Sequence, residues 1–124
     1  MQTLQLDEKF GEDVRTISVW GDVDATDAAQ LRDALRRVPA GAAVVVDLRR
    51  VPFMDSASLG ALICGIRELR ARGGTAALCA RAGGVRRLLA VTGFDRIVVT
   101  AASPDEAADA IGAHGDASVD SYAI

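Results

Sequence analysis

Two stretches close together in the sequence decide the fold: AVVVDL at residues 43–48 and PFMDSASLG at residues 52–60. The first is a short apolar run, which is typical of a strand buried on both faces. The second turns at Asp55 and Ser56 and leads into an apolar stripe with helical spacing, formed by Leu59, Leu62, Ile63, Ile66 and Leu69. A buried strand, a turn and an amphipathic helix predict one unit of an α/β fold, in which functional residues collect in the loops after the strands.

The rest of the chain alternates between strand and helix periods. Thr3–Glu8 and Val14–Trp20 predict an antiparallel hairpin, with Lys9–Asp13 as its polar turn. The other predicted elements are a helix through Ala28, Leu31, Leu35 and Val38, strands at Ala43–Leu48, Thr75–Ala80 and Ile97–Thr100, a helix at Val85–Val91, and a last helix opened by Ser103-Pro104-Asp105-Glu106.

This order predicts the fold class and the extent of the domain. Strands separated by helices of about ten residues pair in parallel. We therefore expect a single small α/β domain, with a mostly parallel five-stranded sheet, an N-terminal antiparallel strand and about four helices. The domain is expected to cover residues 3–114, and residues 115–124, which turn to Gly, Ser and Asp, are expected to form a flexible tail.

The composition excludes several classes of function. With 14 basic and 17 acidic side chains, the net charge of −3 argues against nucleic acid binding. No apolar run approaches the roughly 20 residues of a membrane span, and residues 1–10 lack a signal pattern, so we expect a cytoplasmic protein without membrane insertion. The two cysteines are not in a C-x-x-C pair and there is one histidine, which argues against a zinc site, since a structural site needs about four Cys or His ligands and a catalytic one about three. We expect no metal and no cofactor, although a carboxylate site for magnesium stays open.

Two of the loops after predicted strands are distinctive. The first contains Asp22 and Asp24, and Asp24 with Asp27 has the spacing of a helix cap. The second places Ser56 in the first turn of a helix, where unpaired N–H groups favour an anion. A simple capping role for Asp55 or Ser56 is the structural alternative. Small residues follow Ser56, namely Ala57, Ser58, Gly60, Ala61, Cys64 and Gly65. Because they leave room for another molecule, we expect a docking surface around Ser56.

The sequence around Ser56 does not favour catalysis. It lacks the G-x-S-x-G pattern of a serine hydrolase, and the single histidine, His114, has no obvious orienting carboxylate. The glycine pairs at 73–74 and 83–84 are interpreted as a helix stop and a turn rather than as phosphate loops. Arg81, Arg86 and Arg87 form a small basic cluster, which is interpreted as a solvated face without a ligand.

The distinctive stretches also carry a resemblance to a known family. GDVD at residues 21–24 resembles the G-[DE]-x-D element of the STAS domain family. VVVDL at 44–48 and VPFMDSASLG at 51–60 resemble its central strand and its D-S-[STA]-G-L-G loop, and VRRLL at 85–89 and TGF at 92–94 match its later helices. The resemblance spans residues 3–112, and its nearest branch is the bacterial anti-sigma factor antagonists.

This resemblance implies a partner switch. In that branch, an anti-sigma factor with serine kinase activity phosphorylates the serine after the loop aspartate, which is Ser56 here. Ser58 is a second candidate, at a position where the family usually has glycine. The unphosphorylated antagonist binds the anti-sigma factor and frees the sigma factor, and a PP2C-type phosphatase restores this form. The chain is then not an enzyme and has no catalytic residues. The residues expected to present the site are Asp22, Asp24, Asp55, Ala57, Ser58, Gly60 and Ala61.

Two alternatives stay open. The first is a regulatory STAS subunit of a transporter, of the lipid-transport ABC type, or of a stress-sensing complex, in which Ser56 is not phosphorylated. The second is a small-molecule binder or hydrolase. That class predicts a deep pocket near Ser56, whereas the switch predicts a shallow convex face.

Overall fold

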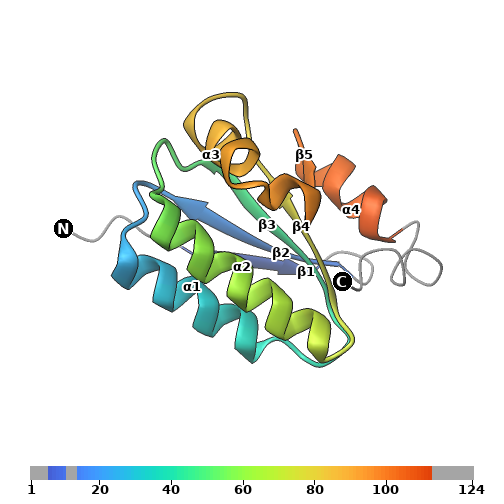
Figure 1. Cartoon of the computed structure of the whole chain (residues 1–124). Coiled ribbons are helices and arrows are strands. Elements are labelled where there is room, and N and C mark those ends of the chain that lie inside the picture. The colour runs from blue at the N-terminus through green and yellow to red at the C-terminus, as the bar shows by residue number, and fades with distance from the viewer. Residues whose placement is uncertain (1–5, 11–13, 113–124) are drawn as a thin grey trace.

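The computed structural model describes residues 6–10 and 14–112 and shows a sheet with helices on both faces (Figure 1). The elements are β1 (Leu6–Phe10), β2 (Val14–Trp20), α1 (Ala25–Arg37), β3 (Ala43–Arg50), α2 (Ser56–Ala71), β4 (Thr75–Cys79), α3 (Gly84–Thr92), the 3₁₀ helix η1 (Phe94–Arg96), β5 (Val99–Ala101) and α4 (Pro104–Gly112). The strand order is β1-β2-β3-β4-β5, with β1 antiparallel to β2 and the other neighbours parallel. The prediction of a small α/β domain with four helices and a largely parallel sheet is confirmed.

The central strand β3 is buried on both faces, as its apolar sequence predicts. Val44 and Val46 belong to the larger core, together with residues of α1, α2 and α3. Val45, between them, belongs to a second core with Ala107 and Ile111 of α4. Successive strand residues point to opposite faces of a sheet, so β3 supplies both cores and holds the two layers of helices apart. Figure 1 shows α1 and α2 on one side of the sheet and α4 on the other.

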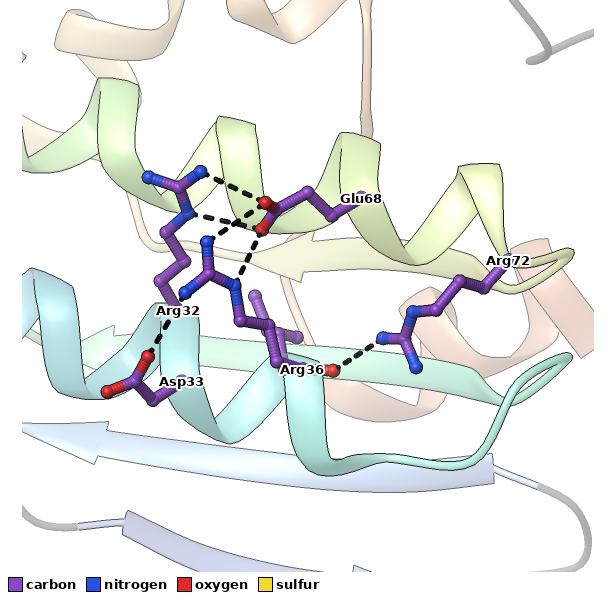
Figure 2. A network of polar contacts seen from close by, with 6 residues as sticks. Arg32, Asp33, Arg36, Glu68 and Arg72 are labelled. Atoms are coloured by element: carbon purple, nitrogen blue, oxygen red, sulfur yellow. Dashed lines mark hydrogen bonds and ion pairs between the residues drawn. The ribbon is translucent and has the colours of Figure 1, made fainter.

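A polar network joins α1 to α2 (Figure 2). Arg32 donates two hydrogen bonds to the Glu68 carboxylate at 3.1 and 3.0 Å, and Arg36 donates two more at 3.2 and 3.0 Å. These bonds, led by those from Arg32, lower the pKa of Glu68 to about 2. At the end of α2, Arg72 donates to two backbone carbonyls at the end of α1, at 2.9 Å each. The network ties the C-terminal part of α2 to α1.

The two helices also approach each other closely at Gly65. A Cβ atom at this position would lie 2.9 Å from Cδ1 of Leu35 and 3.3 Å from Cγ of Arg32. Gly65 is therefore required by the packing of α1 on α2. It is buried there and does not belong to an exposed surface.

The boundaries of β5 and β1 differ from the prediction. The predicted strand Ile97–Thr100 is instead β5 at Val99–Ala101, because the chain closes a 3₁₀ turn first. The amides of Ile97 and Val98 donate to the Phe94 carbonyl at 3.0 and 3.1 Å, and so do not pair in the sheet. β1 extends to Phe10, into the segment predicted as a turn. Several predictions fall outside the described residues. These are the strand start at residues 3–5, the rest of the turn at 11–13, the domain end at 114 and the tail at 115–124.

Candidate functional site

The two distinctive loops lie side by side at the carboxyl edge of the sheet. Their strands, β2 and β3, are parallel neighbours. Beyond the strands, the Gly21 amide donates to the Arg50 carbonyl at 3.1 Å and the Val23 amide donates to the Phe53 carbonyl at 3.2 Å. Val23 also forms an isolated parallel bridge with Met54. These contacts bring the loop of Asp22 and Asp24 next to the loop of Asp55 and Ser56, as the sequence predicts.

Asp24 has the capping role that its spacing predicts. Its Oδ1 accepts a hydrogen bond from the Asp27 amide at 2.9 Å, and its own amide donates to Oδ2 of Asp27 at 3.2 Å. This reciprocal pair is a capping box at the start of α1. The Asp24 side chain is exposed, so it holds the helix start and also adds a negative charge to the surface.

Asp55 caps α2 in the same way, one residue before Ser56. Its Oδ1 accepts a hydrogen bond from the Ser58 amide at 2.7 Å. This bond is the main cause of the lowered pKa of Asp55, and the nearby Ser58 hydroxyl acts in the same direction. Asp55 is therefore ionised at neutral pH and fixed in place. Ser56 is the first residue of α2, and its side chain is exposed.

The structure corrects the expectation for Ser58. Ser58 is only 1% exposed, and its hydroxyl oxygen makes no hydrogen bond of acceptable geometry within the described part of the chain. A kinase or a partner surface has no access to it in the folded chain. Its position in the helix gives the physical reason: Ser58 precedes Leu62 by four residues, so it lies on the face of α2 that packs inward.

The other residues predicted for docking lie at or near the surface. Asp22, Asp55 and Ala57 are exposed, and Gly60 and Ala61 are partly exposed. A Cβ atom at Gly60 would have nothing within 4 Å, in contrast to Gly65. The start of α2 therefore presents a surface without large side chains, next to exposed carboxylates.

Phe53 is a residue of this surface that the sequence analysis missed. It lies three residues before Ser56, and 59% of it is exposed. The following residue, Met54, is 4% exposed and packs inward. Successive side chains of an extended segment point to opposite sides, so Phe53 points outward where Met54 points inward. This alternation could have predicted the exposure of Phe53 from the sequence. Single exposed apolar side chains are common on protein surfaces, so the position of Phe53 three residues before Ser56, rather than its exposure alone, makes it a candidate contact residue.

Comparison with known proteins places this geometry in a family. The family model described as "STAS domain" matches residues 5–107. The chain belongs to the STAS domain family. Within the described residues, this STAS domain has no cluster of three or more His, Cys, Asp or Glu side chains arranged for a metal ion. No helix in the described ranges is long and apolar enough to cross a membrane.

Proteins similar to this STAS domain include named regulators. The anti-sigma-B factor antagonist of Listeria monocytogenes is 32% identical over 84 residues, which cover 66% of this chain and 74% of the relative. The crystal structure of an anti-sigma factor antagonist from Mycobacterium paratuberculosis has a TM-score of 0.79 at 28% identity, covering 89% of this chain and 95% of that one. The unphosphorylated form of the anti-sigma factor antagonist SpoIIAA shares the fold, with a TM-score of 0.69 at 24% identity over 89% of this chain and 96% of that one.

Proposed function

We propose that this STAS domain is a cytoplasmic anti-sigma factor antagonist that is controlled by phosphorylation of Ser56. Its unphosphorylated form binds an anti-sigma factor with serine kinase activity and so releases a sigma factor. The observation that carries this proposal is the exposed Ser56 hydroxyl at the start of α2, one residue after the ionised Asp55 cap. The names of the similar proteins support the partner class.

The proposed reaction uses the chain only as an acceptor. The Ser56 Oγ attacks the γ-phosphoryl group of ATP held by the partner, the bond from that phosphorus to the bridging oxygen breaks, and ADP and a proton are released. A PP2C-type phosphatase then hydrolyses the phosphoserine to serine and inorganic phosphate. Asp24 and Asp55 shape the acceptor loops through their caps.

Charge gives a sufficient reason for phosphorylation to end the binding. A phosphoserine adds about −1.5 to −2 charges at pH 7. It would do so beside the exposed carboxylates of Asp22, Asp24 and Asp55. In the proposed complex, repulsion between this phosphate and one negative charge of the partner surface at about 6 Å, with an effective dielectric constant of about 20, is about 3 kcal/mol, or roughly a hundredfold in affinity.

The fold is expected to survive the modification. The phosphate would stand at the N-terminus of a 16-residue helix, where the helix dipole favours negative charge. The Asp55 cap occupies the Ser58 amide and keeps the first turn in place. The switch therefore works by repelling a partner from an intact surface, with Phe53 and the small residues of α2 as its apolar contact area.

Phosphosite mapping tests the proposal. The purified chain is incubated with ATP and each anti-sigma kinase of its source organism, and the modified residue is located by mass spectrometry. We expect one phosphoryl group on Ser56, none on the Ser56→Ala variant, and unchanged labelling of Ser103→Ala, a control serine at the start of another helix, where its hydroxyl accepts a hydrogen bond from the Glu106 amide. Labelling at another residue would contradict the proposal. The absence of labelling with every kinase, together with stable co-purification of an ATPase, would favour the transporter subunit instead.

A further inference from the structure

Charges are segregated along the outer face of the helix pair α1 and α2. The two helices run parallel, because their starts are joined by the contacts of the candidate site and their ends by Arg72 (Figures 1 and 2). Residues 21–31 and 51–66, which hold the helix starts, contain four aspartates and no lysine or arginine. Residues 32–38 and 67–72, which hold the helix ends, contain six arginines and two acidic residues. The face is therefore negative at one end and positive at the other.

The positive end keeps charge that the packing of the two helices does not use. The network in Figure 2 pairs two of the six arginines with carboxylates, and a third donates to backbone carbonyls. Within the described residues, Arg37 and Arg67 form no ion pair, and both are exposed. A helix dipole favours cations only in the last turn. Arg67 lies before the last turn of α2, so the dipole does not account for its position.

One stripe of α2 joins the two ends of this face. Ser56, Gly60, Cys64 and Arg67 follow one another at spacings of four, four and three residues, so they lie on the same side of the helix. Gly60 is partly exposed and the other three are exposed. Ser56 and Arg67 are separated by about 16 Å along the helix axis. Only small side chains stand between them, so another helix can approach this stripe closely.

We propose that a second copy of this chain docks on this face, with Ser56 of each copy opposite Arg67 of the other, and that phosphorylation of Ser56 tightens the dimer. A face with opposite charges at its two ends is complementary to itself when a two-fold axis crosses its middle, because each negative end then meets a positive end. A phosphoserine adds about −1.5 to −2 charges, which would face the Arg67 guanidinium.

The regulatory consequence rests on the proposed function. In this dimer each copy covers the surface around Ser56 of the other. The phosphorylated chain is then kept from the anti-sigma factor by self-association as well as by charge repulsion. The same added charge repels one partner and attracts a second copy, because the second copy presents arginines where the anti-sigma factor presents a surface suited to a neutral hydroxyl.

Sedimentation velocity on the full chain tests the proposal. Phosphoserine is incorporated at position 56 during translation, so the result does not depend on a kinase. We expect a monomer–dimer equilibrium with a Kd at least tenfold lower for the phosphoserine form than for the unmodified form, and weaker association at higher ionic strength. Chains that stay monomeric in both forms, or that associate equally in both, would overturn the proposal. Binding of the anti-sigma factor is measured in dilute solution, below the Kd of the dimer, so failure of one test leaves the other intact.

Matched variants decide whether Arg67 holds the dimer. In the phosphoserine form, we expect Arg67→Ala to raise the Kd of the dimer at least tenfold with the amide NMR spectrum of the fold retained. Arg87→Ala removes the same charge from an exposed position on α3 and should leave the Kd unchanged. Equal losses in the two variants would contradict the proposed contact.

Cross-linking tests the orientation of the two copies. With Ser56 opposite Arg67, the two-fold axis passes α2 near Ala61 and brings the exposed Cys64 thiols of the two copies within about 12 Å of each other. We expect a bismaleimide of this length to join the copies of the phosphoserine form, and Cys64→Ser to prevent the cross-link. Cys79 is buried and should not react. A dimer that Cys64 does not cross-link would overturn the proposed arrangement.

Discussion

The Val23 amide donates a hydrogen bond of 3.2 Å to the Phe53 carbonyl, and this contact couples the two loops of the candidate site. Val23 is 2% exposed, so the contact is shielded from water. It carries the parallel pairing of β2 and β3 past the ends of the strands. As a result, the capped start of α1 and the capped start of α2 form one continuous surface.

Phe53 is predicted to be an anchor for the anti-sigma factor. Exposed aromatic residues at the centre of an interface often contribute about 2 kcal/mol or more. We expect Phe53→Ala to weaken the binding of the cognate anti-sigma factor at least tenfold in isothermal titration calorimetry, with stability changed by less than about 0.5 kcal/mol. Val91→Ala is the control, because Val91 is also exposed, at 78%, but lies on α3. Equal losses of affinity in Phe53→Ala and Val91→Ala would show that Phe53 is not an anchor of the interface.

Two glycines of α2 are predicted to respond in opposite ways to alanine. Gly60→Ala adds a methyl group in open space and should raise the free energy of unfolding by up to about 1 kcal/mol. Gly65→Ala gains the same helix propensity but meets buried Leu35 at 2.9 Å. Overpacking costs about 1–3 kcal/mol, so Gly65→Ala should be less stable than Gly60→Ala by about that amount. Urea unfolding of both variants measures the difference, and equal stabilities would contradict the packing of α1 on α2.

Glu68 is predicted to make the stability of the fold depend on acid pH. Its pKa falls from 4.5 to about 2 on folding, chiefly because of the hydrogen bonds from Arg32. A carboxylate whose pKa is lower in the folded state stabilises the fold at pH values above its unfolded pKa. This stabilisation is lost as the pH falls toward the folded pKa. The melting temperature should therefore decrease from about pH 4.5 toward pH 2 more steeply in the wild type than in Glu68→Gln. Asp109→Asn, an exposed carboxylate outside the network, serves as the control and should keep the wild-type slope.

The sequence predicted those parts of the fold that are set by local periodicity and caps. The alternation over Val14–Trp20 gave β2 with the bounds that the structure shows, and Asp24 with Asp27 gave the start of α1. β5 was placed two residues too early, because the apolar residues Ile97 and Val98 look like a strand. The amides of Ile97 and Val98 instead donate to the Phe94 carbonyl in a turn, and the pattern of apolar residues does not predict this turn.

The candidate site was only partly predictable, for a related reason. The positions of Asp55 and Ser56 follow from one strand, one turn and one helix. The burial of Ser58 depends on which face of α2 packs inward. Ser58 lies four residues before the apolar Leu62, and this spacing predicts that both lie on the inward face. The contact between Pro52 and Gly84 joins two loops that are about 30 residues apart in the sequence. Only the tertiary structure shows that contact.

The affinity of one anti-sigma factor for the phosphorylated and unmodified forms of this chain tests whether charge at Ser56 controls binding. The unmodified protein, the Ser56-phosphorylated protein and Ser56→Ala are titrated into the same partner. We expect Ser56→Ala to bind like the unmodified form and phosphorylation to raise the Kd roughly a hundredfold, with an unchanged melting temperature. Equal Kd values for the phosphorylated and unmodified forms, or a loss of binding in Ser56→Ala, would contradict a switch based on charge at Ser56.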